Sequence, residues 1–410
     1  MKYRSTRGGD TGRSFDDVLL AGLASDGGLY VPEELPSLPL GWERWGFQEA
    51  MTSTLELFGV ADAAEIVASA GARFPADPAP VVEVADRKVY ELFWGPTLSF
   101  KDHALQILAR LLDRSLETAG RRGLVLGATS GDTGSAAIHA CRGRENLDIV
   151  ILYPEGRVTE FQRRQMTTVP DANVDVVAVR GDFDDCQRLV KALFASRSDL
   201  NPMAINSINF ARIAAQAGYY VGLGARLGRP FDVVIPTGNF GNSYSVWMAK
   251  QLGVPINRIT IANNANHGLA DAVHGVEPER RVIPTLAPSM DIALPSNLER
   301  FFGDLATEFA AGWIDDAAIV DTIRQVHTDY DYLLDPHTAT AWSVGESTRT
   351  EFLQVVVATA HPAKFSEATE TAIGFDPGVP QGWAIDPDLP ERLATIGPEL
   401  AELEAFVSAG

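Results

Sequence analysis

One lysine, Lys101, follows a rigid Gly-Pro pair and precedes a long apolar helical pattern. A lysine amine that is held against a core loses hydration, which lowers its pKa and lets it act as a nucleophile toward carbonyl groups. Most lysines are solvated and do no such chemistry. Lys101 stands out because two loops rich in Gly, Ser, Thr and Asn follow it, at residues 127–135 and 236–243. Each loop comes where a strand is expected to give way to a helix.

The first of these loops, Gly127–Ser135, reads Gly-Ala-Thr-Ser-Gly-Asp-Thr-Gly-Ser. It offers backbone N–H groups, hydroxyls and a helix N-terminus, a combination that suits an anion such as a carboxylate. It lacks the Gly-Lys-Ser/Thr ending of a nucleotide-binding P-loop, and it lacks the Gly-x-Gly-x-x-Gly spacing of dinucleotide sites. The alternative is a tight turn in which Asp132 or Thr133 caps the following helix.

The second loop, Pro236–Ser243, reads Pro-Thr-Gly-Asn-Phe-Gly-Asn-Ser and follows the apolar run Val233–Ile235. Gly238 and Gly241 let the backbone wrap closely around a group at the mouth of a helix, where phosphate is the usual occupant. A plain turn with a helix cap remains the alternative for this loop taken alone.

A third stretch, Ala358–Phe365, follows the apolar run Val355–Val357. Thr359 is a candidate ligand contact. His361 precedes a proline and is interpreted as a turn residue, and Lys364 is expected to be exposed to solvent.

Short β-rich runs alternate with helical stretches from residue 124 onward. This alternation predicts mainly parallel sheets covered by helices, with ligands beyond the carboxyl ends of the strands. We expect a hairpin at Val81–Val84 and Lys88–Phe93, and a helix over Ala104–Ala119. Further strands are expected at Leu124–Leu126, Ile149–Leu152, Val174–Val179, Val233–Ile235, Ile259–Ala262 and Leu353–Ala358. Further helices are expected at Thr159–Thr167, Phe183–Phe194 and Phe210–Leu227.

The composition is that of a soluble globular protein, with 46% hydrophobic residues and a net charge of -20. The acidic excess disfavours nucleic acid or an anionic membrane as a partner. Two isolated cysteines, no signal-like N-terminus and no membrane-length apolar run predict a cytoplasmic protein. His-Glu-x-x-His, Cys-x-x-Cys and Gly-x-Ser-x-Gly are absent from the sequence, so we predict neither a metal site nor a hydrolase serine.

A lysine, a phosphate loop and a carboxylate loop on one parallel α/β scaffold fit the chemistry of pyridoxal 5'-phosphate (PLP). That chemistry needs a Schiff-base lysine, a backbone cup for the cofactor phosphate, and anion donors for an amino-acid carboxylate. The displaced lysine can then act as a proton shuttle.

At this point the sequence resembles the threonine synthases, in particular their microbial and fungal branch, over nearly its whole length. The motifs that carry the resemblance are Ser5–Gly8, Ala24–Pro32, Gly95–Asp102, Ala128–Gly134, Asn206–Asn209, Pro236–Asn242, Asp335–Ala339 and Thr359–Phe365.

The resemblance implies a fold-type II PLP enzyme, similar to the tryptophan synthase β subunit, with two parallel-sheet lobes and an N-terminal helical region. The implied division is residues 1–85 for the N-terminal region, 124–225 for the smaller lobe, and 86–123 with 226–410 for the larger lobe. Lys101 is implied as the residue that forms the Schiff base. The implied cofactor contacts are Lys101, Asp132, Gly238, Asn239, Phe240, Gly241, Asn242 and Thr359. The implied substrate contacts are Thr129, Ser130, Gly131, Asp132 and Thr133.

The implied reaction converts O-phospho-L-homoserine and water to L-threonine and phosphate, in a monomer or homodimer. Two positions depart from the family pattern: Trp94 stands where histidine is usual, and His267 where aspartate is common. They leave open a related PLP enzyme that eliminates or replaces a group on another amino acid. A non-catalytic ligand-binding protein is the rival from a different class. Candidate cations for the substrate phosphate are Arg4, Arg7, Arg157, Arg163, Arg164 and Arg212.

Overall fold

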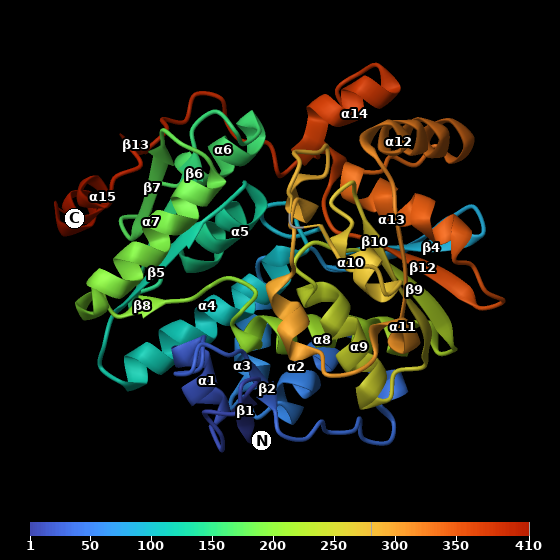
Figure 1. Ribbon diagram of the computed structural model, residues 1–410, viewed down its shortest axis with the longest axis horizontal. Helices are drawn as coiled ribbons and strands as arrows, with labels where there is room; N and C mark the ends of the chain where they lie inside the picture. Colours follow the sequence, from blue (N-terminus) through green and yellow to red (C-terminus); the bar gives the residue numbers. More distant parts are fainter. Residues whose placement is uncertain (280, 410) are drawn as a thin grey trace.

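The computed structural model describes residues 1–279 and 281–409 and contains two main sheets that lie side by side (Figure 1). The first sheet is parallel except for the antiparallel pair β3–β4, and its strands come from residues 81–358. In spatial order its strands are β11 (Phe309–Trp313), β10 (Ile256–Asn263), β9 (Phe231–Pro236), β12 (Leu353–Ala358), β4 (Arg87–Glu91) and β3 (Val81–Val84).

The second sheet is parallel throughout. In spatial order its strands are β13 (Ala394–Ile396), β7 (Val174–Val179), β6 (Leu147–Pro154), β5 (Gly123–Ala128) and β8 (Pro202–Met203). Near the N-terminus, a small antiparallel pair is formed by β1 (Tyr3–Ser5) and β2 (Tyr30–Pro32).

Helices cover the sheets and link them. The N-terminal helices are α1 (Phe15–Ala21), α2 (Phe47–Leu57) and α3 (Ala63–Gly71). Those associated with the second sheet are α5 (Asp132–Cys141), α6 (Glu160–Thr167), α7 (Phe183–Ser196) and α15 (Leu400–Ala409). The others are α4 (Lys101–Thr118), α8 (Phe210–Leu227), α9 (Gly241–Leu252), α10 (Gly268–Val273), α11 (Leu305–Glu308), α12 (Asp316–Tyr330), α13 (Pro336–Ser347) and α14 (Ser366–Ile373). Short 3-10 turns lie at η1 (Trp42–Arg44), η2 (Ser198–Leu200), η3 (Pro288–Met290), η4 (Ser296–Arg300) and η5 (Pro362–Phe365).

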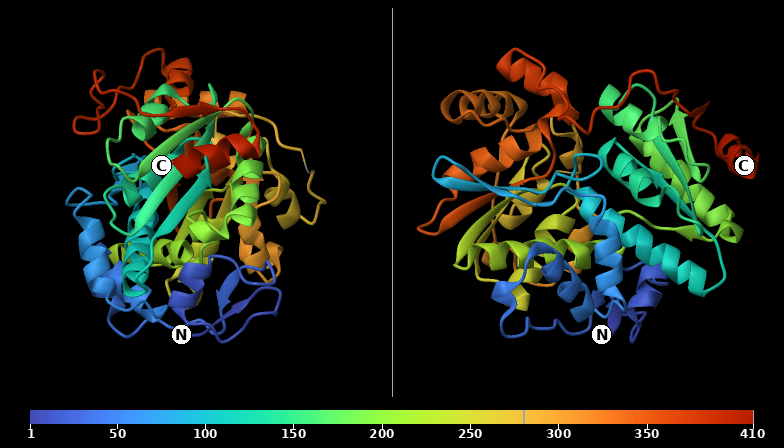
Figure 2. Two further views of the ribbon diagram at one scale, coloured as in Figure 1. Left: turned by 90° about the vertical axis from the view of Figure 1, so that its left-hand side faces the viewer. Right: turned by 180° about the vertical axis from the view of Figure 1, so that it is seen from behind.

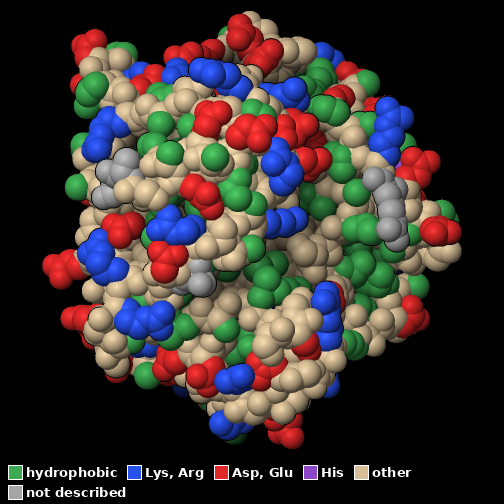
Figure 3. All heavy atoms as spheres, turned by 60° about the vertical axis from the view of Figure 1, so that its left-hand side comes forward, with side chains coloured by type: hydrophobic (Ala, Val, Ile, Leu, Met, Phe, Trp, Pro, Cys, Tyr) green, Lys and Arg blue, Asp and Glu red, His purple; other side chains and the backbone are tan. Residues whose placement is uncertain are grey.

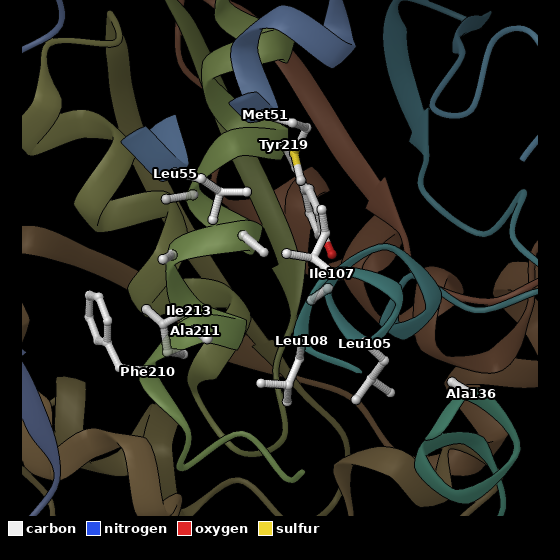
Figure 4. Close-up of a cluster of buried hydrophobic side chains, with 14 of the residues drawn as sticks. Met51, Leu55, Leu105, Ile107, Leu108, Ala136, Phe210, Ala211, Ile213 and Tyr219 are labelled. Carbon is white, nitrogen blue, oxygen red and sulfur yellow. The ribbon is translucent and has the colours of Figure 1, made fainter. Parts of the chain in front are cut away.

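Helices α4 and α8 form the centre of the largest core cluster, where they meet the N-terminal helices (Figure 4). Leu105 and Leu108 of α4 are fully buried, as are Ile213 and Tyr219 of α8. Both helices are apolar on more than one side, as the sequence predicts for α4, because each packs against several neighbours at once. Burying each such side chain contributes about 1.5–3 kcal/mol. Lys101 is the first residue of α4, so this packing fixes its backbone.

The predicted fold class is confirmed. The hairpin forms as β3 and β4, and the predicted strands and helices appear at or within a few residues of their expected bounds. One segment differs from the expected division of the chain: β13 pairs in parallel with β7, and Leu403 of α15 is buried in the core of the second sheet. Residues 394–409 therefore lie with the smaller lobe, although the division implied by the resemblance placed them in the larger one. The remaining domain boundaries stay a prediction.

The face shown in Figure 3 carries acidic and basic side chains side by side, with no large area of one sign. In the described part of the chain, every helix is too short or too polar to span a bilayer.

Candidate active site

The loop before Lys101 runs along the carboxyl end of the central strand β12. The N–H of Leu92 donates to the Ala358 carbonyl at 3.0 Å, and that of Phe100 donates to the Thr359 carbonyl at 2.9 Å. Asp102 fixes the turn, because its carboxylate accepts from the Thr97 N–H at 2.8 Å and the Thr97 hydroxyl at 2.7 Å. Lys101 thus enters its helix at the edge of the sheet where parallel α/β folds bind ligands.

The amine of Lys101 is nearly enclosed. Its Nζ lies 3.2 Å from Asp132 Oδ2 and 3.5 Å from Ser289 Oγ. Burial lowers the pKa of Lys101, and the positive charges of Lys364 and Arg212 act in the same direction, although Asp132 opposes them. A lowered pKa increases the share of the neutral amine, which is the form that attacks a carbonyl carbon.

Asp132, the first residue of α5, is the centre of the polar network. Its Oδ1 accepts from Gln162 Nε2 at 2.9 Å and lies 3.1 Å from Lys364 Nζ, while its Oδ2 accepts from Ser289 Oγ at 3.2 Å. Burial alone would raise the pKa of Asp132, but the charges of Lys364 and Lys101 outweigh it and hold the pKa well below the usual range. Asp132 is therefore a carboxylate at neutral pH.

The expectation that Lys364 is exposed is wrong. Its side chain is fully buried in η5, and its ammonium donates to the Thr97 carbonyl at 2.6 Å and Gln165 Oε1 at 3.1 Å, besides pairing with Asp132. These three contacts match the three N–H donors of the ammonium. Lys364 thus fastens the larger lobe to α5 and α6 of the smaller one.

The loop 127–135 follows β5 and ends at the N-terminus of α5. Thr129 Oγ1 accepts from the N–H groups of Gly131 at 3.0 Å and Gly134 at 2.8 Å, which shapes the loop. Gly131, at φ 130°, is the N-cap residue and has no side chain with which to cap the helix. The alternative of a cap by Asp132 or Thr133 is therefore not what forms. In the first turn of α5 the Gly134 N–H is taken by Thr129, while the N–H groups of Asp132 and Thr133 remain available to an anion.

The loop 236–243 follows β9 and has the same construction. Phe240, at φ 61°, is the N-cap residue of α9 and again no side chain caps the helix. Gly238 is required, since a Cβ atom there would lie 2.4 Å from the Ser289 carbonyl oxygen. Asn242 accepts from the Tyr220 hydroxyl at 2.6 Å, while its own buried amide nitrogen has no partner among the described residues.

The predicted site residues thus lie in four segments: the turn before α4, the loops 127–135 and 236–243, and the segment after β12. Lys101 and Asp132 meet directly, and Thr359, 6% exposed, lies next to the Lys101 turn. The Asn239 side chain is engaged elsewhere, because its Oδ1 accepts from the Ser296 N–H at 2.7 Å.

Several residues of the network were not found from the sequence: Gln162, Gln165, Ser289 and Lys364. Ser289 is held in turn by His337, whose Nε2 accepts from the Ser289 N–H at 3.2 Å. His337 Nδ1 lies 2.6 Å from Asp335 Oδ2, and the Asp-x-His spacing was the one available signal for this pair.

The two positions that depart from the family pattern both have partners. Trp94 Nε1 donates to Glu91 Oε2 at 2.7 Å, and its ring packs beside His361 and Trp383. His267 stacks on Trp313 with ring centroids 4.3 Å apart. Each side chain is thereby held in place by its neighbours.

The site fits PLP. An enclosed lysine amine, an uncapped helix N-terminus behind a glycine with no room for a Cβ atom, and an unpartnered buried amide at Asn242 are what a phosphate-bearing aldehyde requires.

Comparison with known proteins agrees with this geometry. Residues 90–358 match the model of the pyridoxal-phosphate-dependent enzyme family, residues 2–67 match that of the threonine synthase N terminus, and residues 338–407 that of the threonine synthase C-terminal region.

Individual relatives cover the whole chain. The threonine synthase of Pseudomonas aeruginosa is 40% identical, over 100% of this chain and 98% of its own. That of Saccharomyces cerevisiae is 33% identical over 95% of this chain and 92% of its own. The crystal structure of a PLP-bound threonine synthase from Brucella melitensis superposes with a TM-score of 0.94 at 38% identity, covering 100% of this chain and 99% of that one. The chain belongs to the threonine synthase family of pyridoxal-phosphate-dependent enzymes.

Proposed function

We propose that this enzyme is a threonine synthase that uses PLP to convert O-phospho-L-homoserine and water to L-threonine and phosphate. The observation that carries the proposal is the enclosed Lys101 amine, which contacts Asp132 at the start of α5 and Ser289, whose carbonyl lies against Gly238 before α9. Helices α5 and α9 follow strands of different sheets. Such a site offers one anion position for a cofactor phosphate and another for an amino-acid carboxylate.

When bound, PLP supplies an electron sink for negative charge at the α-carbon of the amino acid. The Lys101 amine is the group that would hold the cofactor through a covalent link to its aldehyde carbon. When it is not linked to the cofactor, the Lys101 amine would be the group that takes the α-proton and returns protons to the substrate carbons. The ionised Asp132 stabilises the ammonium form of Lys101 between transfers.

The remaining residues bind and orient. The N–H groups of Ser130, Asp132 and Thr133 are assigned to the substrate carboxylate, while that of Gly131 donates to Thr129 and shapes the loop. The N–H groups of residues 238–242 are assigned to the cofactor phosphate. Thr359 is assigned to the edge of the pyridine ring. Ser289 supports both ends, since its hydroxyl reaches Asp132 and its carbonyl closes the space above Gly238.

The proposal is tested by following phosphate release and threonine formation from O-phospho-L-homoserine with the purified holoenzyme. Equal amounts of both products are expected. If this substrate is inert while another β- or γ-substituted amino acid turns over, the chain is instead a related PLP enzyme that eliminates or replaces a group on that amino acid. A protein that gains no visible absorbance band on addition of PLP would be the non-catalytic binder.

Lys101→Ala tests the site assignment. Since no other residue is proposed to link to the cofactor, the variant is expected to lose the borohydride-reducible linkage and to lose turnover by at least about 10³-fold. Peptide mass spectrometry after reduction of the wild-type enzyme should locate the label at Lys101. A label at Lys364 or at any other lysine would contradict the assignment.

We also propose a cytoplasmic enzyme that is a monomer or a homodimer. Cys141 and Cys186 are both buried free thiols, which is usual in a reducing compartment. Light scattering on the purified protein distinguishes the two assembly states.

A further inference from the structure

Asn242 carries an unused hydrogen-bond donor at the end of the loop 236–243. It is the second residue of α9 and is 8% exposed. Its Oδ1 accepts from the Tyr220 hydroxyl at 2.6 Å, whereas its buried Nδ2 has no partner among the described residues. Because leaving a buried amide N–H unpaired costs stability, this donor at a helix N-terminus points to a ligand that accepts from it.

The other polar side chains of the same loop already have partners. Thr237 Oγ1 donates to the Ile235 carbonyl at 2.9 Å, so the Ser243 hydroxyl, 2.7 Å away, donates to Thr237. Asn239 is engaged at both ends of its amide by serines that lie outside the loop. Among the residues that the structure describes, the Asn242 amide is therefore the side-chain donor of this loop that stays available to an anion.

Tyr220 determines which end of this amide is available. It lies in the middle of α8, fully buried in the largest core cluster, so its ring is held in place. Burial raises the pKa of Tyr220 well above its ordinary value, and the hydroxyl keeps its proton at neutral pH. A hydroxyl that donates to Asn242 Oδ1 turns Nδ2 away from the tyrosine. With the amide reversed, the available atom would be a carbonyl oxygen, which repels an anion.

We infer that Tyr220 is a positioning residue for the cofactor phosphate: by donating to Asn242 Oδ1, it presents the Asn242 amide N–H to a phosphate oxygen. This inference rests on the proposed function, which assigns the cup of residues 238–242 to the phosphate of PLP. A phosphate dianion only accepts hydrogen bonds, so it needs an amide that is turned with its N–H end outward. The backbone N–H groups at the start of α9 act on the same phosphate.

The test compares two ligands that differ only in the phosphate, PLP and pyridoxal. Each is titrated into apoenzyme, and the absorbance of the ligand is followed. Tyr220→Phe keeps the aromatic ring and removes the donor. Its dissociation constant for PLP should rise by about 10-fold, the usual effect of losing one hydrogen bond to a charged group. Its dissociation constant for pyridoxal should change by less than about 2-fold, and Asn242→Ala should show the same selectivity.

Two further variants separate positioning from packing. In Tyr220→Phe/Asn242→Ala, the tyrosine substitution should add less than about 2-fold to the effect of Asn242→Ala on PLP binding, because the amide that it orients is gone. The matched control is Tyr90→Phe, since Tyr90 is also fully buried and its hydroxyl donates to the Tyr219 carbonyl at 2.9 Å. This control should lower the melting temperature of the apoenzyme about as much as Tyr220→Phe does, and it should leave both dissociation constants unchanged.

Several outcomes would overturn the inference. They are unchanged PLP binding in Tyr220→Phe, an equal loss of affinity for PLP and pyridoxal, or effects that multiply in the double variant. Unchanged PLP binding in Asn242→Ala would also overturn it, because the amide would then not reach the phosphate. The proposed reaction can fail separately. If the wild-type holoenzyme releases no phosphate from O-phospho-L-homoserine while Tyr220→Phe still loses affinity for PLP alone, the reaction is wrong and the role of Tyr220 stands.

Discussion

At the residue scale, one buried carboxylate, Asp132, is shared by two ammonium groups. Lys101 approaches Oδ2 at 3.2 Å and Lys364 approaches Oδ1 at 3.1 Å. When Lys101 is linked to the cofactor, Asp132 retains Lys364, Gln162 and Ser289 as partners. Lys364 therefore keeps Asp132 ionised whether or not the reactive lysine is free.

Lys364→Met should destabilise the protein by about 3–5 kcal/mol, because it leaves a buried carboxylate and two buried acceptors without their cation. Urea unfolding of the apoenzyme at pH 7 measures the loss. Lys250→Met is the matched control, since Lys250 is partly exposed and lies 3.7 Å from Glu308, and it should cost no more than about 1 kcal/mol.

The double variant Lys364→Met/Asp132→Asn checks that the cost comes from this pair. Its loss should be smaller than the sum of the two single losses, because the second substitution removes the charge left unpaired by the first. Additive losses would show that Lys364 acts independently of Asp132.

The sequence predicted which chemistry this site performs better than it predicted the hydrogen bonds and ion pairs that hold the site together. Lys101 and the two loops could be found because a lysine, glycines and hydroxyls near strand ends are local signals. Lys364 could not, since burying an ammonium depends on acceptors at Thr97, Asp132 and Gln165, which are distant in sequence. Only the folded chain brings them together.

At the element scale, the N-terminus of α9 depends on close backbone approach. The Ser289 segment crosses so near to Gly238 that a Cβ atom would lie 2.4 Å from a carbonyl oxygen and 3.1 Å from Met290 Cα. Backbone atoms cannot move aside as a flexible side chain could.

Gly238→Ala should therefore displace the loop 236–243 and raise the PLP dissociation constant by at least about 10-fold, the loss of one or more charged hydrogen bonds. Titrating apoenzyme with PLP and following the cofactor absorbance measures this constant. Gly46→Ala is the control, because a Cβ atom there meets nothing within 4 Å and its φ is −73°. An unchanged constant in Gly238→Ala would mean that the cup is not the phosphate site.

The C-terminal elements β13 and α15 complete the second sheet. Leu403 of α15 is fully buried in a cluster with Leu189 and Leu193 of α7. Leu403→Ala should lower the free energy of unfolding by about 2–4 kcal/mol, the usual cost of a cavity left by a buried leucine. Denaturant unfolding measures it, with Leu389→Ala, 43% exposed, expected within about 0.5 kcal/mol of wild type.

Elements were predicted well where periodicity and length were clear. Helix α8 and strands β7 and β12 have the expected bounds. The three residues of β13 carry no such pattern, and their pairing with β7 brings together positions more than 200 residues apart, such as Ala394 and Val177. A pairing of that kind is set by tertiary packing, which local propensity does not report.

At the scale of the whole molecule, buried histidines make the fold sensitive to acid. Burial lowers the pKa of His103 to about 3, although backbone carbonyls of Leu92 and Pro78 act in the opposite direction. Its ordinary value is 6.5, so the unfolded chain binds more protons between these two values. Stability that is fully present above pH 6.5 is therefore lost as the pH falls toward 3.

His103→Phe should keep the aromatic packing against Phe74 and Tyr219 and remove this loss. Compared with wild type, the variant should lose about 3 kcal/mol less stability between pH 7 and pH 4. Unfolding curves recorded over that range check it, with the exposed His274→Gln expected to follow wild type. Sensitivity to acid remains in the variant, because burial also lowers the pKa of His139 and His361 to about 4. Identical pH profiles for His103→Phe and wild type would contradict the assignment.

The chain passes between the two sheets more than once, and after α14 it crosses again to reach β13 (Figure 2).

The order of strands in the first sheet has a consequence for synthesis on the ribosome. β4 meets the rest of its sheet only through β12, which lies between β4 and β9. The hairpin β3–β4 is made early, yet its partner strand begins at Leu353. Throughout the intervening elongation, the β4 edge remains unpaired and open to wrong contacts, so this hairpin is where the nascent chain needs protection.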